Sequence, residues 1–287
     1  MNLLAYETLA VDASSLTSIP GLFIVKNTPL ERLLFDRNML GSDFRLAALS
    51  ASRMMIRHVV DELNAGVFSE LVLLSKGLTY QLAEGSILEG GPNLACNLMA
   101  TSRANVTGST AQIDVSYCQL DAGGDRLIIG DTVASGSTVI AALTKYMERH
   151  SLREIIILSF AGALQGAARI SQFCIDNDIE CRMLFGLAAF GMGDNGFDLS
   201  FLHPDTVTDS AYIERARVQF AGRPVSAVGW DFGSQSMSPQ KYRELCWLEA
   251  EMWDLHGHPS LAQELEPESL ERVRQEYSAF NLKIARP

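Results

Sequence analysis

The stretch that most constrains this fold is 126–138, which reads R-L-I-I-G-D-T-V-A-S-G-S-T. Three apolar residues, 127–129, predict a short buried strand that ends at Asp131. Small residues follow, and the run V-I-A-A-L at 139–143 predicts a helix. A strand, a hydroxyl-rich turn and a helix N-terminus form a phosphate cradle, because unpaired amides and the positive end of the helix dipole point at the anion. An ordinary strand–turn–helix joint of an α/β protein is the alternative, and a P-loop is excluded because no Gly-Lys-Ser/Thr follows.

Length and charge limit the class of protein. The 287 residues can build one large α/β core with an extension, or two small domains. A net charge of −11 disfavours binding to nucleic acid or to an anionic membrane. Five scattered cysteines without a Cys-x-x-Cys pair fit a reduced protein. Glu7 and Asp12 interrupt any signal peptide, and no apolar run reaches the ~18 residues of a membrane helix. We therefore expect a cytoplasmic location.

Three segments carry a resemblance to one family. Residues 130–138, G-D-T-V-A-S-G-S-T, resemble the D-P-M-L-A-T-G-G-S loop of uracil phosphoribosyltransferases, which are type I enzymes that bind phosphoribosyl pyrophosphate (PRPP). Leu30–Arg45 resembles their L-x-x-L-R-D-x-x-T-x-x-x-x-F-R segment, and 190–198 resembles their G-L-G-D-A-G-D segment with a one-residue insertion, in the same order. The resemblance implies an α/β fold, with a mostly parallel central sheet flanked by helices, over residues 1–205. A mainly helical extension over 206–287 would follow.

The resemblance also implies a PRPP site in three parts. After a strand at 70–75 the family has I-L-R-A-G-L, and this chain has L-L-S-K-G-L. Ser75 therefore stands in place of the usual arginine, and Lys76 with Gly77 would meet the pyrophosphate, although a solvated lysine is the alternative. Arg103, near the base of a hairpin, would reach the phosphates with a guanidinium fork. The 5-phosphate loop would consist of Asp131, which would also bind the ribose hydroxyls, with Thr132, Val133, Ala134, Ser135, Gly136, Ser137 and Thr138.

The acceptor site is implied by the third segment. Its residues would be Ala188, Gly193, Asp194, Asn195 and Asp198, and Asp194 with Asp131 would be catalytic. Ala188 replaces a bulkier residue that contacts uracil in the family. The same stretch contains G-x-G-x-x-G at 191–196, but a helix and a βαβ unit do not follow it, which disfavours a dinucleotide site.

One departure bears on function. The uracil enzymes have their loop acid where Gly130 stands, and other type I enzymes have two adjacent acids, of which this chain keeps only Asp131. PRPP is therefore better supported than uracil as a substrate. The expected function is transfer of 5-phosphoribosyl from PRPP, with Mg²⁺, to a uracil-like or other heteroaromatic acceptor, with release of pyrophosphate.

Two other functions remain open. One is a non-catalytic PRPP- or nucleotide-binding regulator on the same fold, and the other is an unrelated α/β protein. No G-x-S-x-G or H-E-x-x-H motif is present, and His256 with His258 is too small a set to predict a metal site of the protein's own. A homodimer is implied by the resemblance alone.

Periodicity predicts the remaining elements. It predicts a helix from Ser42 to about Leu63, a loop-like region at 90–108 with a short apolar segment, and a returning strand at 113–117. It also predicts a strand at 154–160, a helix at 161–174 and a strand at 182–189, and, further on, a short strand at 225–230 and helices from Ser238 and about Pro267.

Overall fold

The computed structural model describes residues 19–36, 41–74, 76–104, 112–193, 199–220, 222 and 226–227. The strands are β1 Leu22–Val25, β2 Ser69–Leu74, β3 Ala95–Ala104, β4 Gln112–Gln119, β5 Arg126–Gly130, β6 Glu154–Ser159, β7 Gly162–Ala163, β8 Glu180–Gly186, β9 Ala188–Phe190 and β10 Val207–Thr208. The helices are α1 Thr28–Phe35, α2 Gly41–Ile56, α3 Val60–Ala65, the 3₁₀ turn η1 Lys76–Thr79, α4 Leu82–Leu88, α5 Ser137–Met147, α6 Leu164–Asp176 and α7 Ser210–Gln219.

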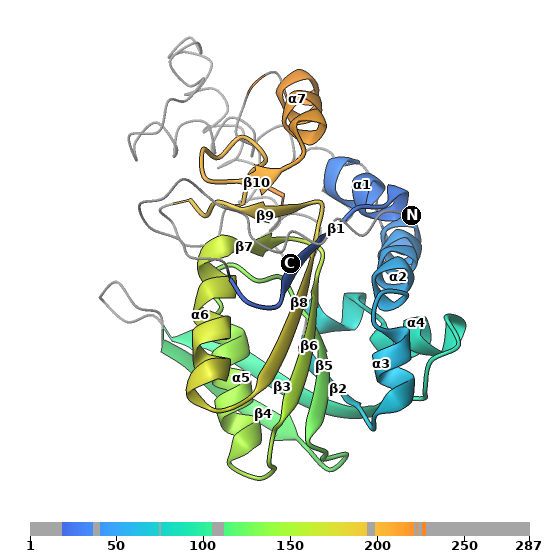
Figure 1. Ribbon diagram of the computed structural model, residues 1–287, viewed down its shortest axis with the longest axis vertical. Helices are drawn as coiled ribbons and strands as arrows, with labels where there is room; N and C mark the ends of the chain where they lie inside the picture. The colour runs from blue at the N-terminus through green and yellow to red at the C-terminus, as the bar shows by residue number, and fades with distance from the viewer. Residues whose placement is uncertain are drawn as a thin grey trace, which may run out of the picture.

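The main sheet has seven strands in the order β1-β8-β6-β5-β2-β3-β4. All neighbours pair in parallel except β3 and β4, which form an antiparallel hairpin. Helices α5 and α6 lie on one side of the sheet and α1–α4 on the other (Figure 1). The central strand β5 is buried on both faces: Ile128 joins one apolar core, and Leu127 and Ile129 join the other. The predicted fold class, a mostly parallel sheet flanked by helices, is confirmed.

The chain leaves β2 and β5 in opposite directions across the sheet. From β2 it passes through α4 to β3, and from β5 it passes through α5 to β6. Because parallel crossovers are right-handed, these two connections lie on opposite faces, and the loops after β2 and β5 diverge. Ligands of open α/β sheets bind in the crevice at such a point, outside the carboxyl ends of the strands.

A second, smaller sheet lies beyond the carboxyl ends of the strands of the main sheet. Its order is β10-β9-β7, and Val133, in the loop after β5, forms a parallel bridge with Gly162 of β7. The register then continues from Gly162 to Ala189 of β9. The loop after β5 is therefore tied by backbone pairing to the region around β9.

Helix α7 packs against α1 through aromatic rings. Phe35 stacks on Phe201, with ring centroids 4.6 Å apart, and on Phe220 at 6.2 Å. Tyr212 Oη donates to Glu31 Oε1 at 2.9 Å, while α7 itself is capped by the Asp209 side chain. The sequence analysis did not predict this helix. The division of the chain at residue 205 stays a prediction. The helices predicted from Ser238 and about Pro267 lie outside the described residues and stay predictions as well.

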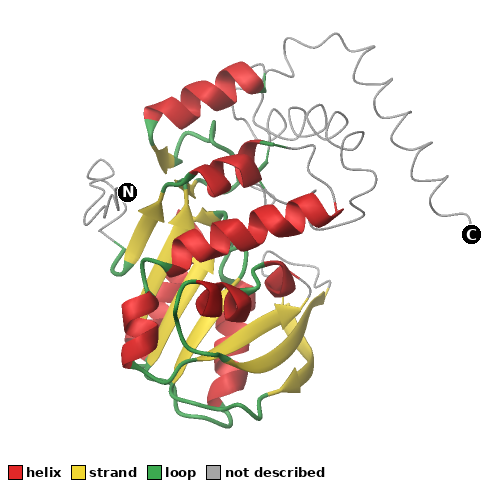
Figure 2. Cartoon of the chain, turned by 90° about the vertical axis from the view of Figure 1, so that its right-hand side faces the viewer, coloured by secondary structure: helices red, strands yellow, loops and turns green. Residues whose placement is uncertain are grey.

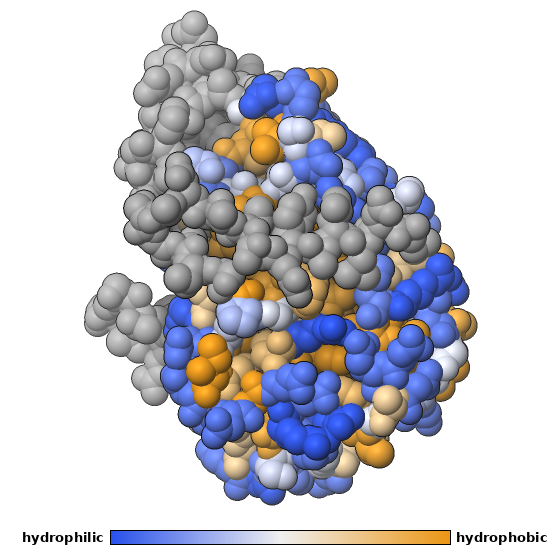
Figure 3. Space-filling view, in the orientation of Figure 1, coloured by the Kyte–Doolittle hydropathy of each residue, from blue (hydrophilic) through white to orange (hydrophobic). Residues whose placement is uncertain are grey.

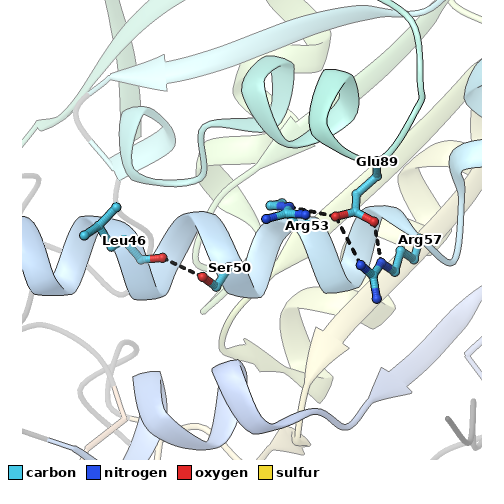
Figure 4. A network of polar contacts seen from close by, with 5 residues as sticks. All are labelled: Leu46, Ser50, Arg53, Arg57 and Glu89. Atoms are coloured by element: carbon cyan, nitrogen blue, oxygen red, sulfur yellow. Dashed lines mark hydrogen bonds and ion pairs between the residues drawn. The ribbon is translucent and has the colours of Figure 1, made fainter.

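The helices on the α1–α4 side are laid across the strands (Figure 2). Helix α2 holds the end of α4 through one carboxylate, Glu89, which binds both Arg53 (2.7 Å) and Arg57 (Figure 4). On α2 itself the Ser50 hydroxyl donates to the Leu46 carbonyl oxygen at 2.9 Å. Within the described ranges, no helix is long and apolar enough to cross a membrane.

Two predicted elements differ from the structure. The helix predicted from Ser42 begins at Gly41 and is broken into α2 and α3, because the amides of His58 and Val59 bond three residues back and close a turn. The prediction of a loop-like region at 90–108 is wrong in part, since β3 occupies 95–104. Its polar residues find partners in the sheet: buried Asn97 donates to the Ser69 hydroxyl at 3.1 Å.

Two further boundaries moved. The predicted helix at 161–174 begins only at Leu164, because residues 162–163 pair as β7. The predicted strand at 182–189 is interrupted at Leu187, whose φ of 61° breaks the extended backbone between β8 and β9. The predicted strands around β2, β4, β5 and β6 are confirmed.

Candidate functional site

The loop after β5 is fixed by hydrogen bonds to the end of β6. The Asp131 amide donates to the Leu158 carbonyl at 3.2 Å, and the Val133 amide to Ser159 Oγ at 3.2 Å and the Ala161 carbonyl at 3.3 Å. In return, the Ala163 amide donates to the Val133 carbonyl at 2.7 Å. Asp131 is only 6% exposed. These bonds attach the loop to the end of β6, with a buried carboxylate at the start of the loop.

Helix α5 begins where the sequence predicted a cradle. Gly136 precedes it with φ of 74°, a conformation that favours glycine. A Cβ on Gly136 would lie 2.9 Å from the Gly166 carbonyl oxygen of α6. In the described part of the chain, the amides of Thr138 and Val139 have no acceptor. These are the unpaired donors that a phosphate group can accept from.

The hydroxyl groups of the loop form a network with α6. Ser135 Oγ donates to Ser137 Oγ at 3.1 Å. Arg169 Nη1 donates to the Ser135 carbonyl at 2.7 Å and to Ser137 Oγ at 3.0 Å. Sequence reasoning missed Arg169, because nothing in a helix thirty residues downstream marks which turn will pack on the loop.

The turn after β2 lies next to the loop after β5. Strands β2 and β5 are parallel neighbours, and a Cβ on Gly77 would lie 3.3 Å from the Gly130 carbonyl oxygen. The Thr79 hydroxyl donates to the Lys76 carbonyl at 2.6 Å and shapes the 3₁₀ turn. The structure thus brings Lys76 and Gly77 to the edge of the sheet where Asp131 lies. Ser75 lies outside the described residues.

A buried tyrosine leaves no room for an acidic side chain at position 130. A Cβ on Gly130 would lie 2.5 Å from Cβ and Cγ of Tyr80, so no larger residue fits there. The Tyr80 ring is fully buried and stacks on Phe160 with centroids 3.9 Å apart. Its Oη accepts from the Phe160 amide at 3.0 Å. The sequence carries no signal for this packing, because Tyr80 comes from a different strand connection.

Burial keeps this tyrosine neutral. Desolvation, and next the nearby Asp131 carboxylate, raise the Tyr80 pKa far above its usual range, while contacts with the Thr132 and Ser159 hydroxyls act in the opposite direction. Thr132 Oγ1 is buried without a well-aligned hydrogen bond to any described residue. The hydroxyl groups of Tyr80, Thr132 and Ser159 therefore gather near the Asp131 carboxylate.

The other predicted site residues are only partly described. Arg103 lies on β3, three residues beyond Ala100, the last residue paired with β2, and opposite Ile113 of β4. Its backbone thus extends about 10 Å past that pairing, and its side chain is outside the described atoms. Ala188 is fully buried and Gly193 is buried. Asp194, Asn195 and Asp198 lie outside the described residues, so their roles stay predictions.

The donors present can take part in holding Mg²⁺ but do not form a metal site alone. Among the described residues, no group of three metal-ligating side chains gathers. Mg²⁺ in phosphate-transfer sites is held by one or two carboxylates together with substrate phosphates. A single carboxylate at Asp131 fits that arrangement.

An open groove of about 520 Å³ lies elsewhere, between α2 and α4. It is lined by Leu49, Ala83, Glu84, Ile87, Leu88 and Asn93, and contains none of the predicted site residues. Apolar walls and one carboxylate do not suit a phosphate ligand. On the face seen in Figure 3, hydrophilic residues surround smaller hydrophobic patches.

Comparison with known proteins gave structural similarities alone. No family model matches the chain, and no curated protein matches it. The AQ2163 protein from Aquifex aeolicus is 15% identical, over 60% of this chain and 95% of that one, with a TM-score of 0.46. An adenine phosphoribosyltransferase from Trypanosoma brucei is 12% identical over 68% and 95% of the two chains, with a TM-score of 0.40. An orotate phosphoribosyltransferase from Aeropyrum pernix is 14% identical over 51% and 73%, with a TM-score of 0.31.

Proposed function

We propose that this protein binds PRPP with Mg²⁺ and transfers its 5-phosphoribosyl group to a uracil-like or other heteroaromatic acceptor, with release of pyrophosphate. The observation that carries the proposal is the meeting of two loops at one point of the sheet. The cradle after β5 and the turn after β2 lie side by side, with Gly77 against the Gly130 carbonyl. PRPP has phosphate groups on opposite sides of its ribose, which is the arrangement that two such loops can hold.

The proposed mechanism depends on positioning and charge. Departure of pyrophosphate develops positive charge on the ribose and negative charge on the leaving group. The loop amides and the Ser135, Ser137 and Thr138 hydroxyls would hold the 5-phosphate, and Asp131 would bind the ribose hydroxyls. Lys76, the Gly77 amide and Arg103 would face the pyrophosphate. Bound Mg²⁺ would supply further positive charge to balance the pyrophosphate. Asp194 would help to orient the acceptor.

The direct test is a substitution at Asp131. Asp131→Asn keeps the shape of the side chain and removes its charge, so PRPP affinity should fall roughly 10- to 100-fold, as for loss of a charged hydrogen bond. Calorimetric titration with PRPP and Mg²⁺ measures it. Asp125→Asn is the matched control, because Asp125 precedes the same strand at its other end and pairs with Arg153. Absence of PRPP binding by the unaltered protein would overturn the proposal.

A second candidate function is a PRPP-binding regulator without catalysis. The packing of Tyr80 on Gly130 favours it, because the loop then has no room for an acid at position 130, where the uracil enzymes have their single loop acid and other type I enzymes have the first of two. The two functions differ in turnover. An enzyme releases pyrophosphate from PRPP when a nucleobase panel is added, whereas a regulator binds PRPP and releases none with any base.

We also propose a homodimer in the cytoplasm. The described cysteines, Cys96, Cys118, Cys174 and Cys181, are free thiols, which suits a reducing compartment. Light scattering of the full chain tests the oligomeric state, and a monomeric mass would contradict it.

A further inference from the structure

Arg169 holds the two serines of the cradle from outside the loop. It lies on α6, three residues after Gly166, and its Nη1 donates to the Ser135 carbonyl at 2.7 Å and to Ser137 Oγ at 3.0 Å. Gly166 makes this approach possible, since a Cβ there would lie 2.2 Å from the Ala134 carbonyl oxygen. Helix α6 therefore packs directly on the loop and places the Arg169 guanidinium beside Ser135 and Ser137.

The hydrogen bonds leave a donor available on Ser137. Ser137 Oγ accepts from Ser135 Oγ and from Arg169 Nη1, which occupies both of its lone pairs. Its own O–H is then a donor for an acceptor outside the network. The Ser135 carbonyl, which would repel an anion, is occupied by Arg169.

The charge of Arg169 is not balanced by a carboxylate. Within the ranges that the structure describes, no acidic side chain lies within ion-pair distance of it, although the protein has a net charge of −11. The arginines that do form ion pairs are Arg53, Arg57, Arg126, Arg153, Arg182, Arg215 and Arg217. Arg169 is exposed, and two contacts use only Nη1, so its remaining N–H groups can bind an anion.

We infer that Arg169 is a phosphate-binding residue, which supplies the positive charge of the cradle and selects the doubly charged phosphomonoester end of the substrate. This rests on the proposed function, in which the cradle holds the 5-phosphate of PRPP. A planar guanidinium fork matches two phosphate oxygens, and the charge adds to what the neutral amides and hydroxyls provide.

The experiment titrates the full chain with ribose 5-phosphate, PRPP with Mg²⁺, and pyrophosphate. Arg169→Gln should weaken ribose 5-phosphate and PRPP roughly 10- to 100-fold and leave pyrophosphate unchanged, because a charged hydrogen bond is lost at one end only. Arg169→Lys should recover part of the loss. Arg217→Gln, an exposed arginine paired with Glu214 on α7, is the matched control and should change none of the three. Equal thermal midpoints check that the fold is intact.

The outcomes separate this inference from the function that it rests on. If the unaltered protein binds ribose 5-phosphate but not PRPP, the proposed function fails, while a loss in Arg169→Gln still supports the phosphate role. Equal affinity of Arg169→Gln and the unaltered protein for ribose 5-phosphate would overturn the inference alone. An equal loss for pyrophosphate would also overturn it, since it would mean general attraction of anions.

Discussion

Tyr80 shows how one side chain can decide the chemistry of a neighbouring loop. Its ring occupies the space beside Gly130, so position 130 can carry no acid. Its hydroxyl oxygen accepts a hydrogen bond from the Phe160 amide. The residue thus joins the turn after β2 to the loops after β5 and β6. We expect its hydroxyl to keep these three loops in register.

Tyr80→Phe tests this expectation. The ring stack is kept, but the buried Phe160 amide loses its acceptor, which should cost about 1–3 kcal/mol of unfolding free energy. PRPP affinity should fall as well, because the loops at the sheet edge shift. Tyr146→Phe is the matched control: Tyr146 is also buried, and its Oη donates to the Gly124 carbonyl at 2.8 Å, before β5 begins. Denaturant titration should find both variants destabilised, and calorimetry should find weaker PRPP binding in Tyr80→Phe alone. Equal PRPP affinities of the two variants would contradict the proposed role of the Tyr80 hydroxyl in keeping the loops in register.

Glu70 is a second residue with a measurable consequence. Burial, and next the charge of Glu84, raise its pKa from 4.5 to about 7, against hydrogen bonds from the Ala83 and Leu82 amides. Because the folded protein binds this proton more tightly than the unfolded chain, the contribution of Glu70 to stability is complete below about pH 4.5. It is lost as pH rises toward 7.

Glu70→Gln should remove this pH dependence. Relative to the unaltered protein, the variant should gain unfolding free energy at pH 8, by at most about 3 kcal/mol, and gain little at pH 4.5. Urea titrations at several pH values measure the difference. Glu84→Gln should give part of the effect, and exposed Glu148→Gln none. A constant difference across pH would show that Glu70 does not titrate in this window.

At the scale of elements, the cradle depends on how closely α6 approaches the loop after β5. The contact is mainly between backbone atoms: a Cβ on Gly166 would lie 2.2 Å from the Ala134 carbonyl oxygen and 3.0 Å from the Gly136 nitrogen, with the Val133 side chain at 2.7 Å. The close packing of α6 on the loop between β5 and α5 therefore requires a glycine at position 166.

Gly166→Ala should destabilise the protein by about 1–3 kcal/mol, as for an overpacked core, and weaken ribose 5-phosphate binding. Gly85→Ala on α4 is the matched control, since there the atom closest to the new Cβ would be the flexible end of the Ile56 side chain, at 2.7 Å. Better helix propensity should offset that contact. Thermal unfolding and titration with ribose 5-phosphate compare the two variants. Equal stability and equal affinity would mean that α6 can shift away from the loop without cost.

At the scale of the whole molecule, α7 is part of the same folded unit as the sheet. Phe35 of α1 stacks with the rings of Phe201 and Phe220, and the Arg215 guanidinium of α7 lies over it, 4.1 Å from the ring centroid. Lys26, after β1, pairs with Asp209 at the start of α7 at 2.8 Å. Residues at both ends of the described chain thus share one core.

Phe35→Ala should therefore cost about 3–5 kcal/mol, in one cooperative transition that includes α7. Exposed Val218→Ala on α7, 74% accessible, should change the stability by less than about 0.5 kcal/mol. Hydrogen exchange of the α7 amides reports the coupling. Loss of protection in α7 while the sheet stays protected would show instead that α7 unfolds separately.

The sequence alone was sufficient for features that depend on neighbouring residues. Apolar runs such as 127–129 and 155–158 identify buried strands, and glycine and hydroxyl residues at 135–138 identify a tight turn before a helix. From these, the buried strands and the position of Asp131 at the end of one of them could be predicted, whereas the mostly parallel sheet was implied by the family resemblance. The loop-like prediction for 95–104 failed because composition does not reveal which polar groups will pair within a sheet.

Only the tertiary structure decided which distant residues meet. Tyr80 against Gly130, Gly166 against Ala134 and Arg169 on Ser137 each join segments from different strand connections. Such contacts depend on the order of strands and on the face to which each helix crosses, and side-chain periodicity carries neither. The sequence therefore determined the kind of loop that the chain would form. The packing of α6 placed the Arg169 guanidinium beside that loop, and the packing of Tyr80, which follows η1, limited the space at position 130.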